Sequence, residues 1–279
     1  MRGLVKDALG RLVSASRLDA LLLRRTGVIV AFHRVQDGHD PEGLSLSREM
    51  FERHCRFFRS HFNVVPLREL VSRLERGETL NRHLAITFDD GYRDNYENAR
   101  PVLEKLSLPA TFFVVSRWID TDAWPWWDRE QGVRHPWMTW EQVAGLAQRG
   151  FDIGAHTRTH VDLGNVSQEI ARDEIFGSRL DLERRLGRAV DLFAYPFGGR
   201  QHITAASRSI VEAAGFRCCC SCHGGLAPAG ADPFRLQRIA ISPWFGSPHQ
   251  FGLELVRERV TRATSGSPRC CEISEAIGY

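Results

Sequence analysis

The sequence has little excess of charge of either sign and no long apolar run. Its 279 residues include 37 lysines and arginines and 34 aspartates and glutamates, a formal net charge of +3. So small an imbalance gives no indication of a nucleic-acid partner. No stretch approaches the roughly 20 apolar residues of a membrane span. Charges also interrupt the first 25 residues, where a secretory signal needs an apolar run of about 7 to 15 residues. We therefore expect a globular, cytoplasmic protein that binds no nucleic acid.

The cysteines lack the spacing of a disulfide framework or of a structural zinc module. They are odd in number, and several are adjacent and cannot easily bridge one another: Cys55, Cys218, Cys219, Cys220, Cys222, Cys270 and Cys271. This usage is typical of a reducing compartment. The run from Cys218 to Cys222 could be read as a soft-metal site, but it has no paired CxxC spacing. We interpret it as the small apolar residues of a strand.

Residues 1–25 predict a basic amphipathic helix. Apolar residues recur there at helical spacing, among the basic residues Arg2, Lys6, Arg11, Arg17, Arg24 and Arg25. We favour a helix that closes one end of the main domain. The alternative is a helix that lies on an anionic membrane surface. The protein would then be peripheral at the inner membrane face and would suit a lipid-linked saccharide substrate.

Seven short runs rich in β-branched and aromatic residues predict the strands of the main domain. They are 27–33, 83–88, 110–115, 151–156, 190–195, 215–221 and 235–241, and helical periodicity appears over 97–106, 141–149, 167–187 and 204–214. Apolar strands that alternate with helices indicate a parallel sheet covered by helices. We predict an α/β fold, a distorted (β/α) barrel of about seven strands. Residues 1–26 would form the N-terminal helix, 27–262 the main domain and 263–279 a tail.

Polar residues stand where predicted strands end. His33, Asp89, Asp90 and His156 each follow or close an apolar run, and the carboxyl ends of parallel strands meet at one rim. Two consecutive carboxylates there would repel each other. A divalent cation on Asp90 would relieve the repulsion and leave Asp89 free to take a proton from water. The alternative is a solvated turn.

His156 and His160 are four residues apart in HTRTH. On a helical turn, both imidazoles would lie on one face. With Asp90 they would form a ligand set of catalytic zinc sites, which leave one position open; nickel, cobalt or iron would accept the same ligands. Two surface histidines share this spacing by chance, but together with the aspartate pair it predicts a divalent metal site, with zinc favoured.

Three motifs in order resemble the NodB-like polysaccharide deacetylases, carbohydrate esterase family 4. They are AITFDDGYRDNYENARPVLEKLSLPATFFVV, DIGAHTRTHVDL and FAYPFGGR, and the resemblance spans roughly residues 27–245. It implies that residues 27–262 form a deacetylase catalytic domain in which Asp89 is the base. It also implies that a metal is held by Asp90, His156 and His160. The turn of this family lines the substrate groove and lends a backbone N–H to the oxyanion, which here implies Tyr195, Pro196, Phe197 and Gly198.

The sequence departs from the family pattern in two respects. Many members carry an arginine where this chain has Ala194. Arg238, which we group with the substrate-binding residues, is our candidate to orient the base instead. The usual C-terminal Leu-x-His acid motif is also missing. The chain resembles the poly-N-acetylglucosamine deacetylase subgroup in element order, which implies that His33 is the acid; the alternative is a structural histidine.

Six of the seven tryptophans lie between Trp118 and Trp140. Aromatic faces stack well on the apolar faces of sugar rings. We predict a saccharide platform in which Trp127 contacts substrate, with Asp128 as a further candidate. Trp118 and Trp140 are expected in the core.

These features predict a hydrolase that removes N-acetyl or N-formyl groups from amino sugars of a glycan, an oligosaccharide or a lipid-linked precursor. One alternative is an O-acetyl carbohydrate esterase that uses the same machinery. Another is a non-catalytic glycan-binding protein on the same fold, which the two departures keep open. The intact Asp89 and the complete ligand set favour the enzyme.

Overall fold

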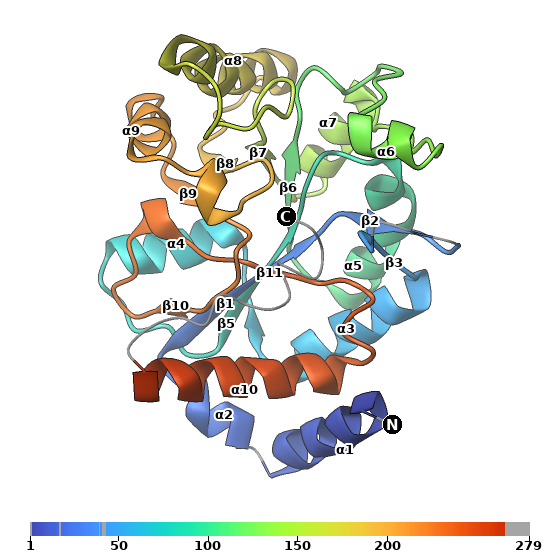
Figure 1. Cartoon of the computed structure of the whole chain (residues 1–279), viewed down its shortest axis with the longest axis vertical. Helices are drawn as coiled ribbons and strands as arrows, with labels where there is room; N and C mark the ends of the chain where they lie inside the picture. The colour runs from blue at the N-terminus through green and yellow to red at the C-terminus, as the bar shows by residue number, and fades with distance from the viewer. Residues whose placement is uncertain (1, 17, 39, 41–42, 266–279) are drawn as a thin grey trace.

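Six parallel strands form the main part of the sheet (Figure 1). The computed structural model describes residues 2–16, 18–38, 40 and 43–265. The strands follow the order β1 (Thr26–Phe32), β5 (His83–Phe88), β6 (Thr111–Val114), β7 (Asp152–Ala155), β8 (Leu192–Ala194) and β9 (Cys218–Cys220). Every residue of β1 and β5 is buried, as expected of parallel strands covered on both faces.

A seventh strand joins the two ends of this row. β11 (Ile239–Ala240) pairs in parallel with β1, and Leu236 forms a parallel bridge with Cys220 of β9. The seven predicted strands are thus present, and the fold is the predicted distorted (β/α) barrel, closed by a single bridge between β9 and the segment before β11. Four further strands of two residues complete the sheets: β4 (Asn63–Val64) beside β5, β10 (Ala227–Pro228) antiparallel to β1, and the separate pair β2 (Arg34–Val35) and β3 (Ser45–Leu46).

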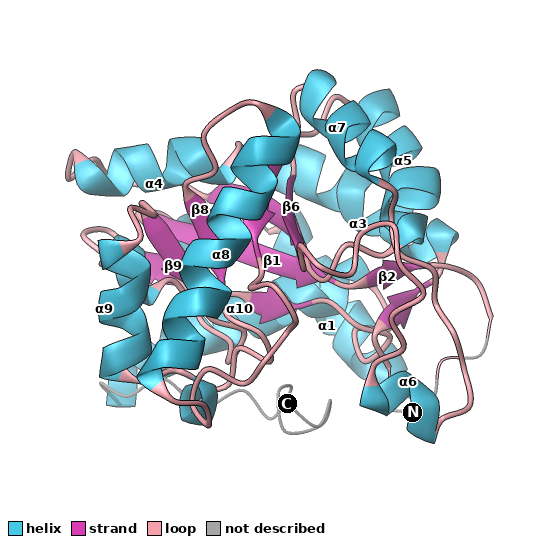
Figure 2. Ribbon diagram, turned by 90° about the horizontal axis from the view of Figure 1, so that it is seen from above, coloured by secondary structure: helices cyan, strands magenta, loops and turns pink. Residues whose placement is uncertain are grey.

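Helices surround the strands, as the view from above shows (Figure 2). One face of the sheet packs against α3 (Arg48–His61), α5 (Arg100–Leu106), α7 (Trp140–Gln148), α8 (Gln168–Leu186) and α9 (Ala205–Ala213). The other face packs against α4 (Leu67–Glu75). Three of the four predicted helices match α7, α8 and α9. The fourth begins later than predicted, since the π-helical turn η1 (Asn95–Ala99) precedes α5.

The first three cysteines of the run lie in β9, as predicted, and Cys222 follows the strand and is also buried. Cys218, Cys219 and Cys220 are all buried in this strand. The five cysteines in the described part of the chain are free thiols. Cys270 and Cys271 lie outside the described residues. The run therefore supplies small core residues to the sheet.

The N-terminal segment forms two helices rather than the predicted one. α1 (Arg2–Ala15) and α2 (Leu18–Leu22) both pack against α10 (Pro248–Ser265) at the lower end of the molecule in Figure 1. Helix α10 continues to Ser265, beyond residue 263 where the tail was predicted to begin; residues 266–279, the rest of that predicted tail, lie outside the described residues. No described helix has the length and apolar content to cross a bilayer.

Candidate metal centre and active site

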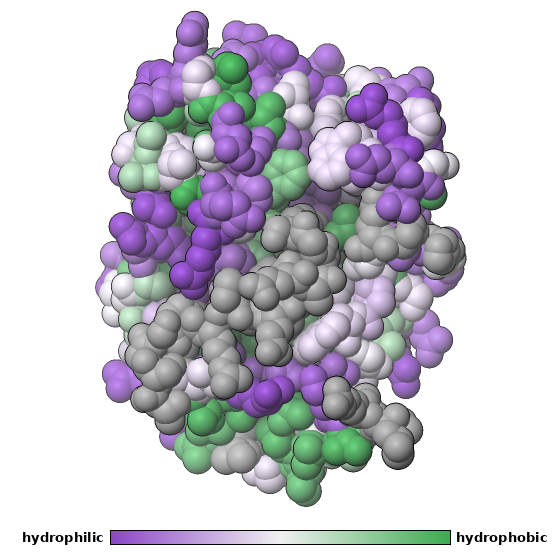
Figure 3. Space-filling view, viewed as in Figure 1, coloured by the Kyte–Doolittle hydropathy of each residue, from purple (hydrophilic) through white to green (hydrophobic). Residues whose placement is uncertain are grey.

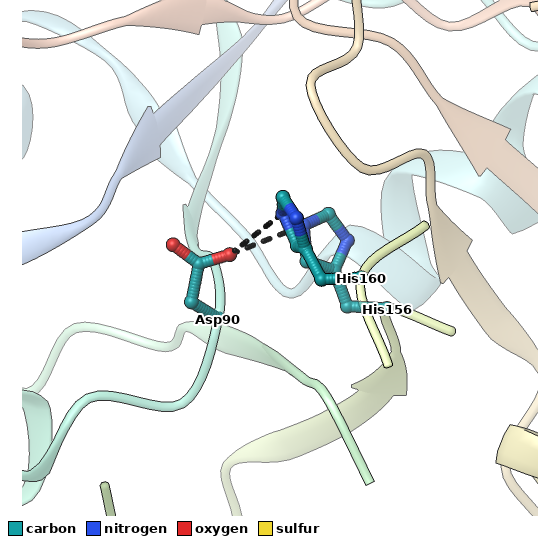
Figure 4. A group of neighbouring side chains, drawn as sticks. All are labelled: Asp90, His156 and His160. Atoms are coloured by element: carbon teal, nitrogen blue, oxygen red, sulfur yellow. Dashed lines mark ion pairs between the residues drawn. The ribbon is translucent and has the colours of Figure 1, made fainter. Parts of the chain in front are cut away.

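Asp90, His156 and His160 come together at the carboxyl ends of β5 and β7 (Figure 4). The Oδ1 atom of Asp90 lies 3.4 Å from Nε2 of His156 and 3.3 Å from Nε2 of His160. All three side chains are buried, and their candidate ligand atoms lie within 4.8 Å of one another. Two atoms that each bind one tetrahedral Zn²⁺ at about 2.0–2.1 Å are themselves roughly 3.3 Å apart. The donor set and its spacing therefore fit a divalent metal.

Hydrogen bonds and burial prepare these side chains as ligands. Asp90 Oδ1 is buried and accepts no hydrogen bond from the described residues. The Nδ1 atom of His156 lies 2.8 Å from the carbonyl oxygen of Ala194, and an N–H donated there would turn Nε2 toward Asp90 as a lone-pair donor. A buried carboxylate oxygen without a hydrogen-bond partner, beside an imidazole that a hydrogen bond orients toward it, fits a metal site.

Electrostatics favour the protonation states that bind a metal. Burial acts to raise the pKa of Asp90, but the imidazoles of His156 and His160 outweigh it and hold this pKa well below its ordinary value. Burial lowers the pKa of His160, against the opposing charge of Asp90. The result is an ionised carboxylate beside a neutral imidazole.

The HTRTH segment is a loop, which corrects the predicted helical turn. Thr157 and His160 have φ of 62° and 58°, in the left-handed region that a right-handed helix excludes. Glu174 of α8 holds the loop by accepting hydrogen bonds from the backbone N–H of Arg158 at 2.8 Å and of Thr159 at 2.9 Å. Loop geometry, rather than helical periodicity, brings the two imidazoles together.

Asp89 forms a bidentate ion pair with the fully buried Arg238. Two hydrogen bonds of 2.7 Å join the guanidinium to both carboxylate oxygens, and Arg238 also donates to Thr87 Oγ1 and to the carbonyl oxygen of Ser221. Arg238 thus occupies the orienting position considered for it. In this structure Arg238 is fully buried and contacts Asp89, Thr87 and Ser221, so its contacts are those of an orienting residue, and its grouping with the substrate-binding residues stays a prediction. Burial acts to raise the pKa of Asp89, yet Arg238 keeps this pKa below its ordinary value.

His33 lies beside this pair at the end of β1. Its Nε2 atom is 4.0 Å from Asp89 Oδ2, and the side chain is almost fully buried. Asn95 donates a hydrogen bond of 2.8 Å to the His33 carbonyl oxygen and so fixes the strand end. Burial lowers the pKa of His33, against the charges of Asp90 and Asp89.

The turn after β8 contains the four residues that the resemblance places at the substrate groove, Tyr195 to Gly198. The Tyr195 N–H donates to the carbonyl oxygen of Cys220, and the Gly198 N–H donates to that of Pro196, while proline has no N–H. Of these four residues, only Phe197 has an N–H without an acceptor in the described part of the chain, and its ring centroid is 4.7 Å from that of His160. The Tyr195 side chain belongs to the core against Phe193 rather than to the metal cluster.

Tryptophans form one wall around His160. The Trp118 and Trp127 ring centroids lie 5.4 and 5.1 Å from that of His160, with Trp127 carried by α6 (Trp126–Glu130). Trp118 therefore lies at the site rather than in the core, where we expected it. Asp128 is fully buried and ion-paired with Arg34 at 3.3 Å, and its contact with substrate stays a prediction.

Two supporting residues were missed from sequence. Glu174 falls between Ala171 and Ile175 on the buried stripe of α8, and a charge at such a position is a usable signal. Arg34 is fully buried and ion-pairs with both Asp40 and Asp128. Its only sequence signal is its place directly after His33.

Comparison with known proteins places the chain in a family. Residues 76–219, more than half of the chain, match the family model described as polysaccharide deacetylase. The chain belongs to the polysaccharide deacetylase family, and the resemblance found in its motifs is confirmed.

Relatives and solved structures agree with this assignment. One relative is YxkH of Bacillus subtilis, which is named as a polysaccharide deacetylase. The two sequences are 25% identical over 217 residues, which cover 77% of this chain and 71% of YxkH. The poly-β-1,6-N-acetyl-D-glucosamine N-deacetylase of Escherichia coli is 26% identical over 136 residues, 47% of this chain but only 20% of that protein. The structure of IcaB from Ammonifex degensii superposes with a TM-score of 0.70 at 22% identity, covering 83% of this chain and 97% of that one. At this identity the superposition supports the fold alone.

Proposed function

We propose that this protein is a metal-dependent hydrolase that removes N-acetyl groups from amino sugars of a glycan or glycan precursor, with zinc as the favoured metal. The observation that carries the proposal is the buried Asp90, His156 and His160 cluster next to Asp89, which Arg238 holds through both oxygens. Two further residues support this proposal: Asp89, a carboxylate held in place that can act as the base, and His33, a histidine close to it. The name of the Escherichia coli relative supports an N-acetylated substrate.

A divalent cation bound to the three ligands would supply Lewis-acid polarisation of the acyl oxygen and of a water molecule. Asp89 accepts a proton as the water oxygen bonds to the carbonyl carbon. The Phe197 N–H donates to the oxygen that gains negative charge. Trp118 and Trp127 stack on the sugar.

His33 delivers the proton that the leaving nitrogen needs. Because burial lowers its pKa, the imidazole is neutral at rest. Its Nε2 atom lies 4.0 Å from Asp89 Oδ2, which is longer than a hydrogen bond, so the proton that Asp89 takes from water reaches His33 through one bridging water molecule. As the C–N bond breaks, His33 protonates the nitrogen, and acetate and a free amine are released.

Acetate release from a panel of N-acetylated and O-acetylated saccharides tests the proposal. Zinc-restored protein should release acetate from an N-acetylated glycan, and metal-stripped protein should not. Asp89→Asn should bind zinc without turnover, whereas Asp90→Ala should lose both. Activity on O-acetyl sugars alone would replace the proposal with an esterase, and an active metal-free protein would refute the role of the metal.

A further inference from the structure

Helix α1 turns its apolar side chains to solvent. Val5, Leu9 and Leu12 are 58%, 49% and 66% exposed, and Leu21 of α2 is 59% exposed. Ordinary surface helices bury such a stripe. Figure 3 shows hydrophobic residues gathered along the lower edge of the molecule, where Figure 1 places α1 and α2. We call Val5, Leu9, Leu12 and Leu21 the apolar edge.

The inner side of α1 is built from polar residues and a glycine. Lys6 forms an ion pair of 3.1 Å with Glu254 of α10 and lies over the ring of Trp244, and Asp7 accepts a hydrogen bond from Ser247. Gly10 faces the His249 carbonyl oxygen, and a Cβ at Gly10 would lie 2.1 Å from that oxygen. Rotating α1 to bury its leucines would break these contacts. The outward apolar edge is therefore fixed by the packing of the helix.

The segment that carries the apolar edge is strongly basic. Residues 2–25 contain six basic residues and two acidic ones, Asp7 and Asp19, a difference of +4. Arg11, Arg24 and Arg25 are exposed. The nearby carboxylates of Asp7 and Glu254 already form ion pairs with Arg11 and with Lys6 and Arg257. Apolar side chains flanked by exposed arginines, in a segment with an excess of positive charge, complement an anionic lipid surface.

We propose that α1 and α2 dock on an anionic bilayer, parallel to its surface, with the apolar edge in the boundary between headgroups and acyl chains. A second copy of this chain is a less favourable partner for the apolar edge. Pairing the apolar edges of two copies would bring two basic segments together, and their positive charges would repel each other. The inference rests on the N-terminal helices alone and is independent of the proposed catalytic function.

Co-sedimentation of the full chain with vesicles tests the docking. The protein should bind vesicles of phosphatidylcholine mixed with phosphatidylglycerol, bind phosphatidylcholine alone much more weakly, and be released as sodium chloride rises. The double variant Leu9→Glu with Leu12→Glu should lower the partition coefficient more than about tenfold, because each leucine withdrawn from acyl chains costs at least that factor.

The matched control introduces the same two charges elsewhere. Ile170 and Leu180 of α8 are both 48% exposed and lie outside the apolar edge, so Ile170→Glu with Leu180→Glu should bind vesicles like the unmodified chain. Amide hydrogen exchange of the unmodified chain should slow in residues 2–25 when vesicles are added, which tests the docking without any substitution. Absence of binding, equal binding by the two double variants, or a dimer in light scattering that only Leu9→Glu with Leu12→Glu dissolves would overturn the proposal.

Discussion

Asp89 keeps its charge in a buried position because Arg238 bonds to both of its oxygens. Arg238→Met would leave this carboxylate without its partner, and we expect the free energy of unfolding to fall by about 3–5 kcal/mol. Arg238→Lys keeps the charge but loses the two-pronged contact, so its stability loss should be smaller while turnover still falls. Urea denaturation and acetate release measure the two effects. Equal stability of both variants and the unmodified protein would show that the pair contributes nothing.

His33 offers a sharper separation of binding from catalysis. His33→Ala should retain zinc, because none of the three candidate ligands is changed, but should lower kcat by roughly a hundredfold or more, as loss of a general acid does. Elemental analysis gives the zinc content and acetate release gives kcat. Turnover close to that of the unmodified protein would refute the acid role.

The site residues that lie within recognisable sequence motifs could be predicted. TFDD and HTRTH identified the side chains that the structure brings together, and the missing arginine at Ala194 led to Arg238. The sequence could not predict the backbone that holds them. Asp90, Thr157, His160 and Phe197 all adopt left-handed φ, which costs non-glycine residues energy and depends on distant partners such as Glu174.

Among the elements, the seven strands were predictable because each is a short, mostly apolar run rich in β-branched or aromatic residues or cysteine, separated from the next by a helical or loop segment. The break between α1 and α2 was not, since helical spacing continues across it. The orientation of α1 was also hidden, because periodicity identifies an apolar face without saying what covers it.

The junction between β2 and the π-helical turn η1 contains a titratable group. Asp94 Oδ1 accepts a hydrogen bond of 2.8 Å from the backbone N–H of Val35, and burial raises the pKa of Asp94 to about 6 from its ordinary 3.8. The folded state therefore binds this proton more tightly than the unfolded state does. Its contribution to stability falls as pH rises between these two values and stays low above about 6.

Asp94→Asn removes this titration and keeps an oxygen that can accept from Val35. The variant should be more stable than the unmodified protein by up to about 3 kcal/mol near pH 8, and the difference should vanish below about pH 4. Denaturant unfolding at several pH values measures it. A difference that does not change with pH would contradict the raised pKa.

For the whole molecule, metal binding should be linked to stability, because the candidate ligands come from loops after two separate strands. At free zinc about a hundredfold above its dissociation constant, the gain is about 2.7 kcal/mol. A chelator should then lower Tm by roughly 5–10 °C, and added zinc should restore it. Calorimetry measures the Tm with chelator and after zinc is restored. Asp90→Ala is the control, and its Tm should not change with either zinc or chelator. An unchanged Tm in the unmodified protein would argue against a metal at this cluster.

The position of β1 in the barrel also constrains how the protein can be made. β1 is the first strand of the chain, yet it pairs with β5, β10 and β11, the last of which ends at Ala240. During synthesis one edge of β1 must wait, unpaired, while some 200 further residues leave the ribosome. An open apolar strand edge invites pairing with other chains. Until the residues of β10 and β11 have been synthesised, this edge of β1 therefore has no partner strand within the described fold.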